Sequence, residues 1–443
     1  MGEFASTTIY EGLALVLVPL WLVFMLVGKN ENKVLASFDF IYVFFIFMNY
    51  RVPPRRYGFS IFAVIVLLLF VFLMMRRVVT HRRIFDREIS SKPGIIAGLL
   101  FVGILIVSGI LSVDPEFTVT RAVAFAMYFL FFFLCISNIS RPILVHRLTR
   151  YLALWASVNF LFVVGQQIWG VTFSLYPEDL LTNSNIFLAG AMWRYFGFFY
   201  DVLLMGYFAS VVSVYLLGSA WLAREGQKKA LQLIPAGLAF VSAVFSGTRS
   251  AILGWLVGVS TYLVMGAGHL RQRIAIGLLA AVLIGLLYFF GSDVSLLARL
   301  PQTDQAANNR TAIWAQAIPV VLDSPYVGHG LGSYDDFTNK MELYQSNIYA
   351  VYPWSESVYV TLAVEAGILG GAAFLLFVFF YLSRVIWGKY TKKERKSAYL
   401  PAIAATAAWL TCGVAVSPFY DVRLLIVLFS LLALLGAHEV VDG

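Results

Sequence analysis

The chain has 443 residues, of which 60% are hydrophobic and only 13% are charged, and its mean hydropathy is +0.82. Because charged residues make up about a quarter of a soluble domain, this composition excludes a soluble globular protein. The formal net charge of +8 requires no nucleic-acid partner, since the positions of the basic residues explain it.

Apolar runs recur along the whole chain. A helix needs about 20 apolar residues to cross a bilayer. The candidate spans are 10–27, 34–49, 59–75, 93–112, 122–137, 151–170, 198–222, 231–247, 250–267, 274–290, 357–383, 399–416 and 421–437. The 34–49 run is short and aromatic, so we predict an all-α polytopic integral membrane protein with 12–13 transmembrane helices.

Basic residues indicate how these spans are oriented. Most of the 32 lysines and arginines fall in five short connections, at 76–92, 138–150, 224–229, 271–273 and 384–396. An even number of spans separates these connections, so they share one side, and the positive-inside rule makes that side cytoplasmic. The C-terminus is then cytoplasmic, and the opposite side receives the long polar stretch 292–356.

Four arginines depart from this inside bias and are candidate functional residues: Arg194, Arg249, Arg310 and Arg423. An arginine at the edge of the hydrophobic zone is costly unless it is paired or hydrated. Each could instead snorkel to the interface or pair with a carboxylate. Arg249 fits those alternatives least, because its SGTR turn lies between two spans. Several outward-facing arginines suit a dianionic ligand, since guanidinium groups grip phosphate oxygens.

The polar stretch 292–356 is predicted to begin with an amphipathic helix. Asn308 or Asn309 is a suitable N-cap, and apolar residues from 313 to 321 form a stripe that bends or ends near Pro319. Arg310 falls in the first turn, where free backbone N–H groups favour an anion.

A turn-rich segment, SPYVGHGLGSY, follows this helix, and its glycines permit close backbone approach to a ligand. Aromatic residues gather here and beyond. Tyr334, Tyr352 and Trp354 are candidates either for an interfacial belt or for stacking against sugar rings. The two cysteines, Cys135 and Cys412, lie in apolar runs, so we expect no disulfide, no metal site and no cofactor.

Four short motifs occur in a specific order. They are Arg194-x-x-Gly197-Phe198 with Asp201, the SGTRSA turn from Ser246 to Ala251, Arg310 with Trp314 and the glycines of PYVGHGLGSY, and Tyr359 through Glu365 to Gly370. In this order they resemble the bacterial O-antigen ligase/polymerase superfamily of Wzy-type membrane glycosyltransferases, over about residues 190–372. The resemblance implies a fold like that of GT-C-type membrane glycosyltransferases, in the bacterial inner membrane, with a periplasmic active site.

The sequence departs from this family at the end of the loop. The family commonly has H-N-x-Y there, and its histidine is implicated in ligase chemistry. Alignment on Tyr359 and Glu365 puts Glu356 at that histidine, whereas His329 lies in the glycine-rich segment. We predict that Glu356 is the catalytic base, helped by His329. A helix-capping role for Glu356 and a hydrogen-bonding role in the loop for His329 are the alternatives.

The resemblance implies metal-independent, inverting transfer of a glycan from undecaprenyl pyrophosphate, with Arg194, Arg249 and Arg310 binding the pyrophosphate. The missing histidine favours a polymerase of O-antigen or exopolysaccharide repeat units over a ligase that transfers the glycan to lipid A-core. A lipid-linked oligosaccharide flippase is the alternative from another class. Expected partners are these lipid-linked glycans, the acceptor, membrane lipids and a chain-length regulator.

The predicted organisation has four parts. They are N-terminal transmembrane helices (1–190), helices with outward-facing arginines (191–291), an extracytoplasmic catalytic loop (292–356) and C-terminal transmembrane helices (357–443).

Overall fold

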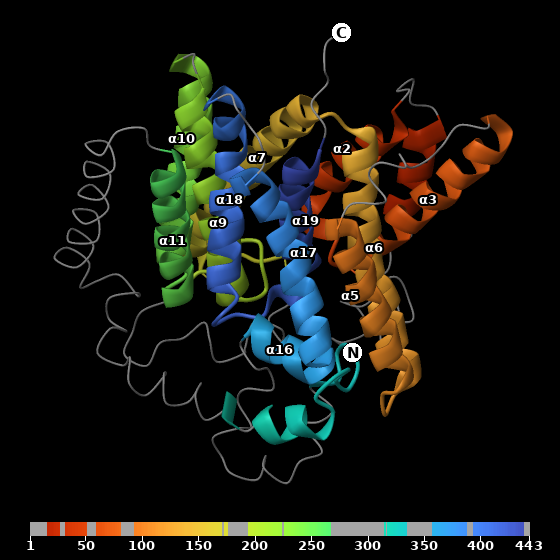
Figure 1. Cartoon of the computed structure of the whole chain (residues 1–443). Coiled ribbons are helices and arrows are strands. Elements are labelled where there is room, and N and C mark those ends of the chain that lie inside the picture. Colours follow the sequence, from red (N-terminus) through yellow and green to blue (C-terminus); the bar gives the residue numbers. More distant parts are fainter. Residues whose placement is uncertain are drawn as a thin grey trace.

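Helices make up nearly all the regular secondary structure in the computed structural model of the chain (Figure 1). The structure describes residues 16–26, 32–50, 59–80, 93–170, 172–175, 194–223, 226–266, 314–315, 317–334, 357–387 and 393–437. Of the predicted spans, 274–290 lies wholly outside these residues. The others coincide with helices, and the first of them contains the helix Val16–Leu26.

The longer helices follow the apolar runs in chain order. They are α2 (Lys33–Val43), α3 (Ile61–Thr80), α5 (Pro93–Ile110), α6 (Pro115–Asn138), α7 (Arg141–Trp169), α9 (Val202–Leu222), α10 (Gly226–Phe245), α11 (Arg249–Gly266), α16 (Val358–Glu365), α17 (Gly367–Trp387), α18 (Lys393–Cys412) and α19 (Val422–Gly436). Among the described helices, α6, α7, α9 and α11 are long and apolar enough to cross a membrane, and several shorter helices are also apolar. This architecture is consistent with the predicted polytopic membrane protein.

Helix boundaries follow local capping signals. The Asp114 side chain accepts a hydrogen bond from the amide of Phe117, and Pro115 begins α6, as expected for an N-cap followed by proline. Helix α7 begins at Arg141, so most of the predicted connection 138–150 is helical, and its place relative to the membrane stays a prediction. The buried Arg141 side chain stacks on the Tyr399 ring, at 4.3 Å from its centroid, which lets this basic segment join the bundle.

Two groups of helices are visible in Figure 1. Helices α9, α10, α11 and α18 pack on one side, α3, α5 and α6 pack on the other, and α17 and α19 lie between them. The contact between α11 and α18 depends on small residues. A Cβ atom added at Gly258 would lie 2.9 Å from the carbonyl oxygen of Ala404, and one at Gly254 would lie 2.9 Å from that of Ala408. This spacing of four residues permits the close helix contact typical of membrane bundles.

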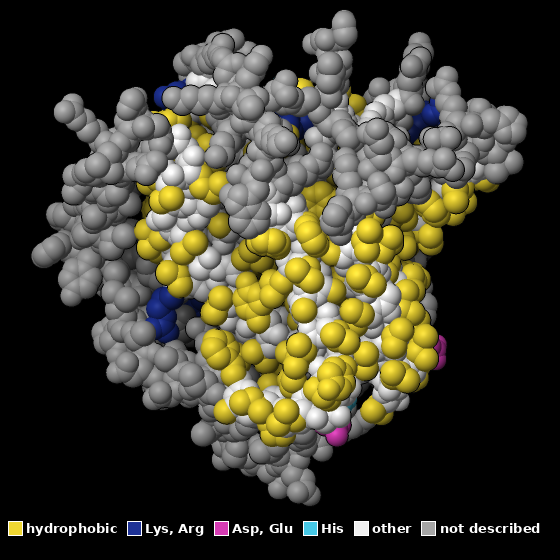
Figure 2. Space-filling view, viewed as in Figure 1, with side chains coloured by type: hydrophobic (Ala, Val, Ile, Leu, Met, Phe, Trp, Pro, Cys, Tyr) yellow, Lys and Arg dark blue, Asp and Glu magenta, His cyan; other side chains and the backbone are white. Residues whose placement is uncertain are grey.

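Hydrophobic side chains cover the middle of the face shown in Figure 2. Lys and Arg side chains show at the upper end of that view and in one patch at the left below the middle, and the Asp and Glu side chains that are visible lie in the lower half. The same upper end holds the start of α10 and the end of α19 in Figure 1. The uneven charge agrees with the asymmetry on which the predicted orientation rests, and that orientation stays a prediction.

The predicted span 357–383 is broken into α16 and α17. Gly367 has a positive φ of +66°, and the carbonyl of Glu365 accepts hydrogen bonds from the amide of Gly330 at 2.9 Å and from the Ser108 hydroxyl at 2.8 Å. The amide of Ile368 donates to the carbonyl of Pro325 at 2.8 Å. The sequence 324–334, here called the glycine segment, thus supplies partners at the break that a continuous helix would supply internally.

The helix before the glycine segment runs past Pro319 and ends at Asp323. The prediction that it could end at the proline was therefore wrong, although its predicted N-cap and first turn lie outside the described residues. Ala317 and Val320 pack against Tyr334 and Val364. Helices α10 and α18 also contain interior prolines, so proline is repeatedly accommodated within helices of this chain.

Arg423, one of the four arginines singled out by the sequence, forms a fully buried ion pair with Asp421. Its Nη2 lies 2.5 Å from Asp421 Oδ2, and its Nε donates to Oδ1 at 3.0 Å. Its Nη1 also donates to the carbonyl of Phe198 at 3.2 Å, and its Cζ lies 4.1 Å from the centroid of the Phe199 ring. Asp421 also caps α19. Arg423 therefore joins α19 to the segment 194–201.

The helix break gives a first prediction. Gly367→Ala should lower the apparent melting temperature in detergent, because the new Cβ would clash with the carbonyl of Tyr326 at a positive φ. Gly371→Ala is the matched control, since the nearest atom to its Cβ would be Leu362 Cβ at 4.0 Å. Equal melting temperatures for the two variants would contradict the proposed role of the break.

The ion pair gives a second prediction. Arg423→Met should destabilise the protein by roughly 3–5 kcal/mol, because Asp421 would keep a buried charge without its cation. The double variant D421N/R423M should recover much of that loss, since asparagine keeps the cap on α19 and removes the charge. Thermal unfolding of Arg423→Met, Asp421→Asn and the double variant beside wild type measures this coupling, and purely additive effects would contradict it.

Candidate functional site

Two of the predicted arginine motifs meet at one end of the bundle. The Arg194 side chain, which is 1% exposed, donates from Nε to the carbonyl of Ser246 at 2.7 Å and from Nη2 to the Thr248 hydroxyl at 3.1 Å. The amide of Tyr195 donates to the carbonyl of Phe245 at 3.2 Å. The segment 194–201 is thus fastened to the turn between α10 and α11, which carries Arg249.

That turn, Ser246–Ser250, is internally bonded. Gly247 has a φ of +62°, a conformation that favours glycine. The Ser246 hydroxyl accepts from the amide of Thr248 at 3.1 Å and donates to the carbonyl of Ala243, while the Thr248 hydroxyl also bonds to the carbonyl of Val202. The turn therefore presents the start of α11 in a fixed orientation.

Arg249 and Ser250 are the first two residues of α11. Arg249 is half-buried, and the Ser250 side chain is only 9% exposed. Among the described residues, the Ser250 hydroxyl has no hydrogen-bond partner. The first amides of a helix also lack partners within the helix and carry partial positive charge. This helix start combines a guanidinium, a buried hydroxyl and helix amides, a set that can receive an anion.

The glycine segment forms the second part of the site. Its His329 side chain is 9% exposed, and Nε2 lies 2.9 Å from the carbonyl of Val320 and 3.9 Å from Asp323 Oδ2. A carbonyl accepts hydrogen bonds but cannot donate them, so Nε2 carries the proton and only Nδ1 can act as a base. The backbone amide of His329 donates to the carbonyl of Val364 at 3.0 Å. These contacts agree with a loop hydrogen-bonding role for His329, and its catalytic role stays a prediction.

The glycines of this segment approach the protein's own backbone. A Cβ atom at Gly328 would lie 2.5 Å from the carbonyl carbon of Glu365, and one at Gly330 would lie 2.7 Å from Thr118. At these two positions the space is occupied by the protein itself, at the α16–α17 break and at α6, and a role of the glycines in ligand binding stays a prediction. Tyr334 is buried, and its amide donates to Glu365 Oε1 at 3.3 Å.

A short chain of contacts links the two parts of the site. The Cys412 thiol, at the end of α18, donates to the carbonyl of Ser250 at 3.4 Å. The next residue, Gly413, accepts from the amide of Val358 at 2.8 Å, and Ser357 is the N-cap of α16. The starts of α11 and α16 therefore meet at the end of α18.

Several predicted site residues lie outside the described residues. They are Arg310, Tyr352, Trp354 and Glu356. Their predicted roles therefore stay predictions. Glu356 directly precedes the α16 N-cap, Ser357.

Residues of α7 that sequence reasoning missed also touch the site. Gln166 and Asn159 are both 1% exposed and bond to the segment 194–201. The signal was available, because polar amides within an apolar span are costly and usually have a specific role.

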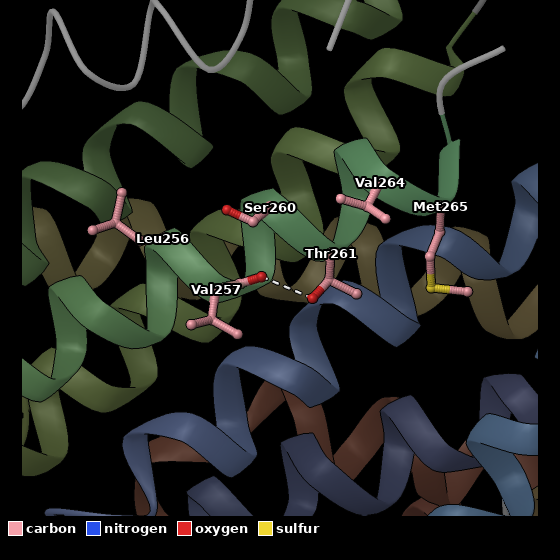
Figure 3. A pocket seen from close by; sticks show the side chains of 6 residues that line it. All are labelled: Leu256, Val257, Ser260, Thr261, Val264 and Met265. Atoms are coloured by element: carbon pink, nitrogen blue, oxygen red, sulfur yellow. Dashed lines mark hydrogen bonds between the residues drawn. The ribbon is translucent and has the colours of Figure 1, made fainter. Parts of the chain in front are cut away.

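Two further observations concern ligand binding elsewhere in the described residues. Among the described residues, no group of three or more His, Cys, Asp or Glu side chains could hold a metal ion. A groove of about 370 Å³ runs along α11 and is lined by Leu256, Val257, Ser260, Thr261, Val264 and Met265 (Figure 3). The groove has few polar groups to offer a ligand, since the Thr261 hydroxyl already donates a hydrogen bond to the carbonyl of Val257. This groove lies two or more turns from Arg249 and is mainly apolar.

Comparison with known proteins supports the resemblance seen in the motifs. No curated protein matches the chain. Residues 234–375 match the family described as O-antigen ligase (Wzy_C). The matched region begins within α10 and ends within α17, and it includes the Ser246–Ser250 turn, the glycine segment and α16. The chain therefore carries an O-antigen ligase (Wzy_C) domain over residues 234–375.

Proposed function

We propose that this chain is a membrane glycosyltransferase that polymerises oligosaccharide repeat units carried on undecaprenyl pyrophosphate. The observation that carries the proposal is that the Arg194 and Arg249 motifs contact each other at the start of α11. Both motifs lie at the end of a largely apolar bundle, where a lipid-linked anion would bring its pyrophosphate to the membrane surface. The O-antigen ligase match over 234–375 supports the same class of reaction.

The electrostatic argument concerns the leaving group. When the bond between the anomeric carbon and the pyrophosphate breaks, negative charge develops on the phosphate oxygens. Arg249, the Ser250 hydroxyl and the α11 amides would stabilise that charge, with Arg194 contributing from behind the turn and Arg310 from the loop. Fixed cations and dipoles directed at developing charge usually make the largest contribution to catalysis. Pyrophosphate is already a good leaving group, so the proposal needs neither a general acid nor a metal.

The acceptor hydroxyl would attack the anomeric carbon on the face opposite the pyrophosphate, and this attack would invert the anomeric centre. A carbon–oxygen bond forms to the acceptor, the bond to pyrophosphate breaks, and Glu356 takes the proton of the hydroxyl. The position of Ser357 supports this assignment, because the α16 N-terminus meets the end of α18 beside Ser250. His329 is the second candidate base and would have to act through Nδ1.

Ligase activity is the main alternative, and the family description favours it. It differs only in the acceptor, which would be lipid A-core in place of another lipid-linked repeat unit. We favour polymerisation because Glu356 stands where the family commonly has its ligase histidine. The flippase alternative is weaker, since a transport path gives no reason for the Arg194 and Arg249 motifs to meet at one end of the bundle.

The arginine site gives a third prediction. In a strain that lacks this protein, wild type should restore long polymer, whereas Arg249→Ala should leave single repeat units, with turnover reduced roughly 10²–10³-fold. Arg249→Lys should recover part of the activity, because lysine keeps the charge but not the fork. The control is Arg76→Ala, an exposed arginine near the end of α3. Long polymer from Arg249→Ala at normal protein levels would contradict the proposal.

The base gives a fourth prediction. Glu356→Gln should lower turnover by roughly 10²–10⁴-fold, since the amide cannot take a proton. Product analysis in the same strain separates the alternatives. A ligase would leave lipid-linked polymer that is not transferred to core, and a flippase would tolerate the substitution. Full polymer from Glu356→Gln would remove Glu356 as the base and leave His329 as the candidate.

A further inference from the structure

The side-chain amide of Gln166, near the end of α7, forms hydrogen bonds with backbone groups through both its oxygen and its nitrogen. Its Oε1 accepts from the amides of Phe196 at 3.1 Å and Gly197 at 3.0 Å. Its Nε2 donates to the carbonyls of Gly197 at 2.7 Å and Phe173 at 3.2 Å. The side chain is 1% exposed. One buried side chain therefore satisfies four backbone groups in segments without regular secondary structure.

A second amide continues this contact deeper along the same helix. Asn159 lies two turns before Gln166, and its Oδ1 accepts from the amide of Phe198 at 3.4 Å. Gly197 has a φ of +59°, and a Cβ atom there would clash with the Asn159 side chain. The backbone of Gly197 thus lies directly against α7.

Opposite α7, the segment 194–201 contacts the turn that carries Arg249. Arg194 precedes Phe196 by two residues, and its guanidinium binds Ser246 and Thr248 in the turn that begins α11. The amide of Tyr195 donates to the carbonyl of Phe245 at 3.2 Å. The segment is therefore held between Gln166 of α7 and the turn that carries Arg249.

We propose that Gln166 is a positioning residue for the proposed pyrophosphate site. It fixes the backbone of the segment 194–201, so that the Arg194 guanidinium reaches the Ser246–Ser250 turn and orients Arg249. The inference rests on the proposed function of that site. Gln166 lies outside the O-antigen ligase match, which begins at residue 234.

The chemistry at this position requires an amide. Two N–H donors face one end of the side chain, and two carbonyl acceptors face the other. A glutamate of the same shape would place a negative oxygen against both carbonyls when ionised. When protonated, it would again offer one donor and one acceptor. Only the protonated form keeps the pattern of the amide, so the substitution should behave like glutamine at low pH.

The test is Gln166→Glu, with Gln167→Glu as the matched control, because Gln167 is exposed on the same turn of α7. At pH 8, Gln166→Glu should raise the KM for the lipid-linked donor about tenfold and leave the KM for the acceptor unchanged. The activity of Gln166→Glu relative to wild type should rise as the pH falls from 8 to 5.5. Gln167→Glu should show neither effect.

Neighbouring groups do not mimic this pH profile. The side chains of the segment 194–201 that can carry charge are Arg194, which stays protonated, Tyr195, whose pKa is raised by burial, Tyr200, and Asp201, which caps α9 by accepting from the amide of Leu203. Comparison with wild type at each pH also cancels the titration of the base. A loss of activity independent of pH, or a Gln166→Glu enzyme indistinguishable from Gln167→Glu, would overturn the inference.

One further variant separates this inference from the function on which it rests. Arg194→Ala should raise the donor KM at every pH, because its charge is lost. If Arg194→Ala is inactive while Gln166→Glu and Gln167→Glu both have the activity of wild type, the inference about Gln166 is wrong and the proposed pyrophosphate site is not affected. If Arg194→Ala has the activity of wild type, the proposed pyrophosphate site itself fails. Gln166→Met, which removes all four hydrogen bonds, should lower the apparent melting temperature and show no recovery at low pH.

Discussion

The burial of guanidinium groups at one end of an apolar bundle is the constraint on which the rest of this structure depends. A cation removed from water must be compensated by hydrogen bonds or by an opposite charge. Arg423 is compensated by Asp421 and the carbonyl of Phe198, and Arg194 by the carbonyl of Ser246 and the Thr248 hydroxyl. These partners all belong to helix ends or turns, where backbone groups are available. The arginines therefore fix the segment 194–201 and the start of α11 relative to α19.

The break between α16 and α17 lies at the same end of the bundle as these arginines (Figure 1). At the α16–α17 break, the carbonyls of Val364 and Glu365 accept from the glycine segment, and the amide of Ile368 donates to it. Irregular backbone that is buried needs hydrogen-bond partners for its polar groups. The glycine segment meets this condition by docking onto the broken helix and onto Thr118 of α6. The break in the helix thus leaves backbone groups free to form hydrogen bonds with the glycine segment.

Much of the fold could be predicted, because apolar runs long enough to cross a bilayer can be recognised directly in the sequence. The positions of α9, α11 and α19 follow directly from such runs. The break at Gly367 was not predicted, because the hydrogen-bond partners that stabilise it lie in distant segments, and Glu365 and Gly367 alone do not identify a break within the largely apolar run 357–383. The meeting of Arg194 with the Ser246–Ser250 turn was suggested by the motifs, whereas the ion pair of Arg423 required knowledge of Asp421 in space. Gln166 was missed because hydropathy averages it away among apolar neighbours.

The limits of the sequence match also differ from the limits of the structural unit. The O-antigen ligase match covers 234–375, yet the turn at Ser246–Ser250 is held by Arg194, and the break after α16 is held by Ser108. Both supporting residues precede the matched region. Each donates to a backbone carbonyl, that of Ser246 or that of Glu365, and such a carbonyl is present whatever side chain the residue carries. One site is therefore built partly from the matched region and partly from residues that precede it.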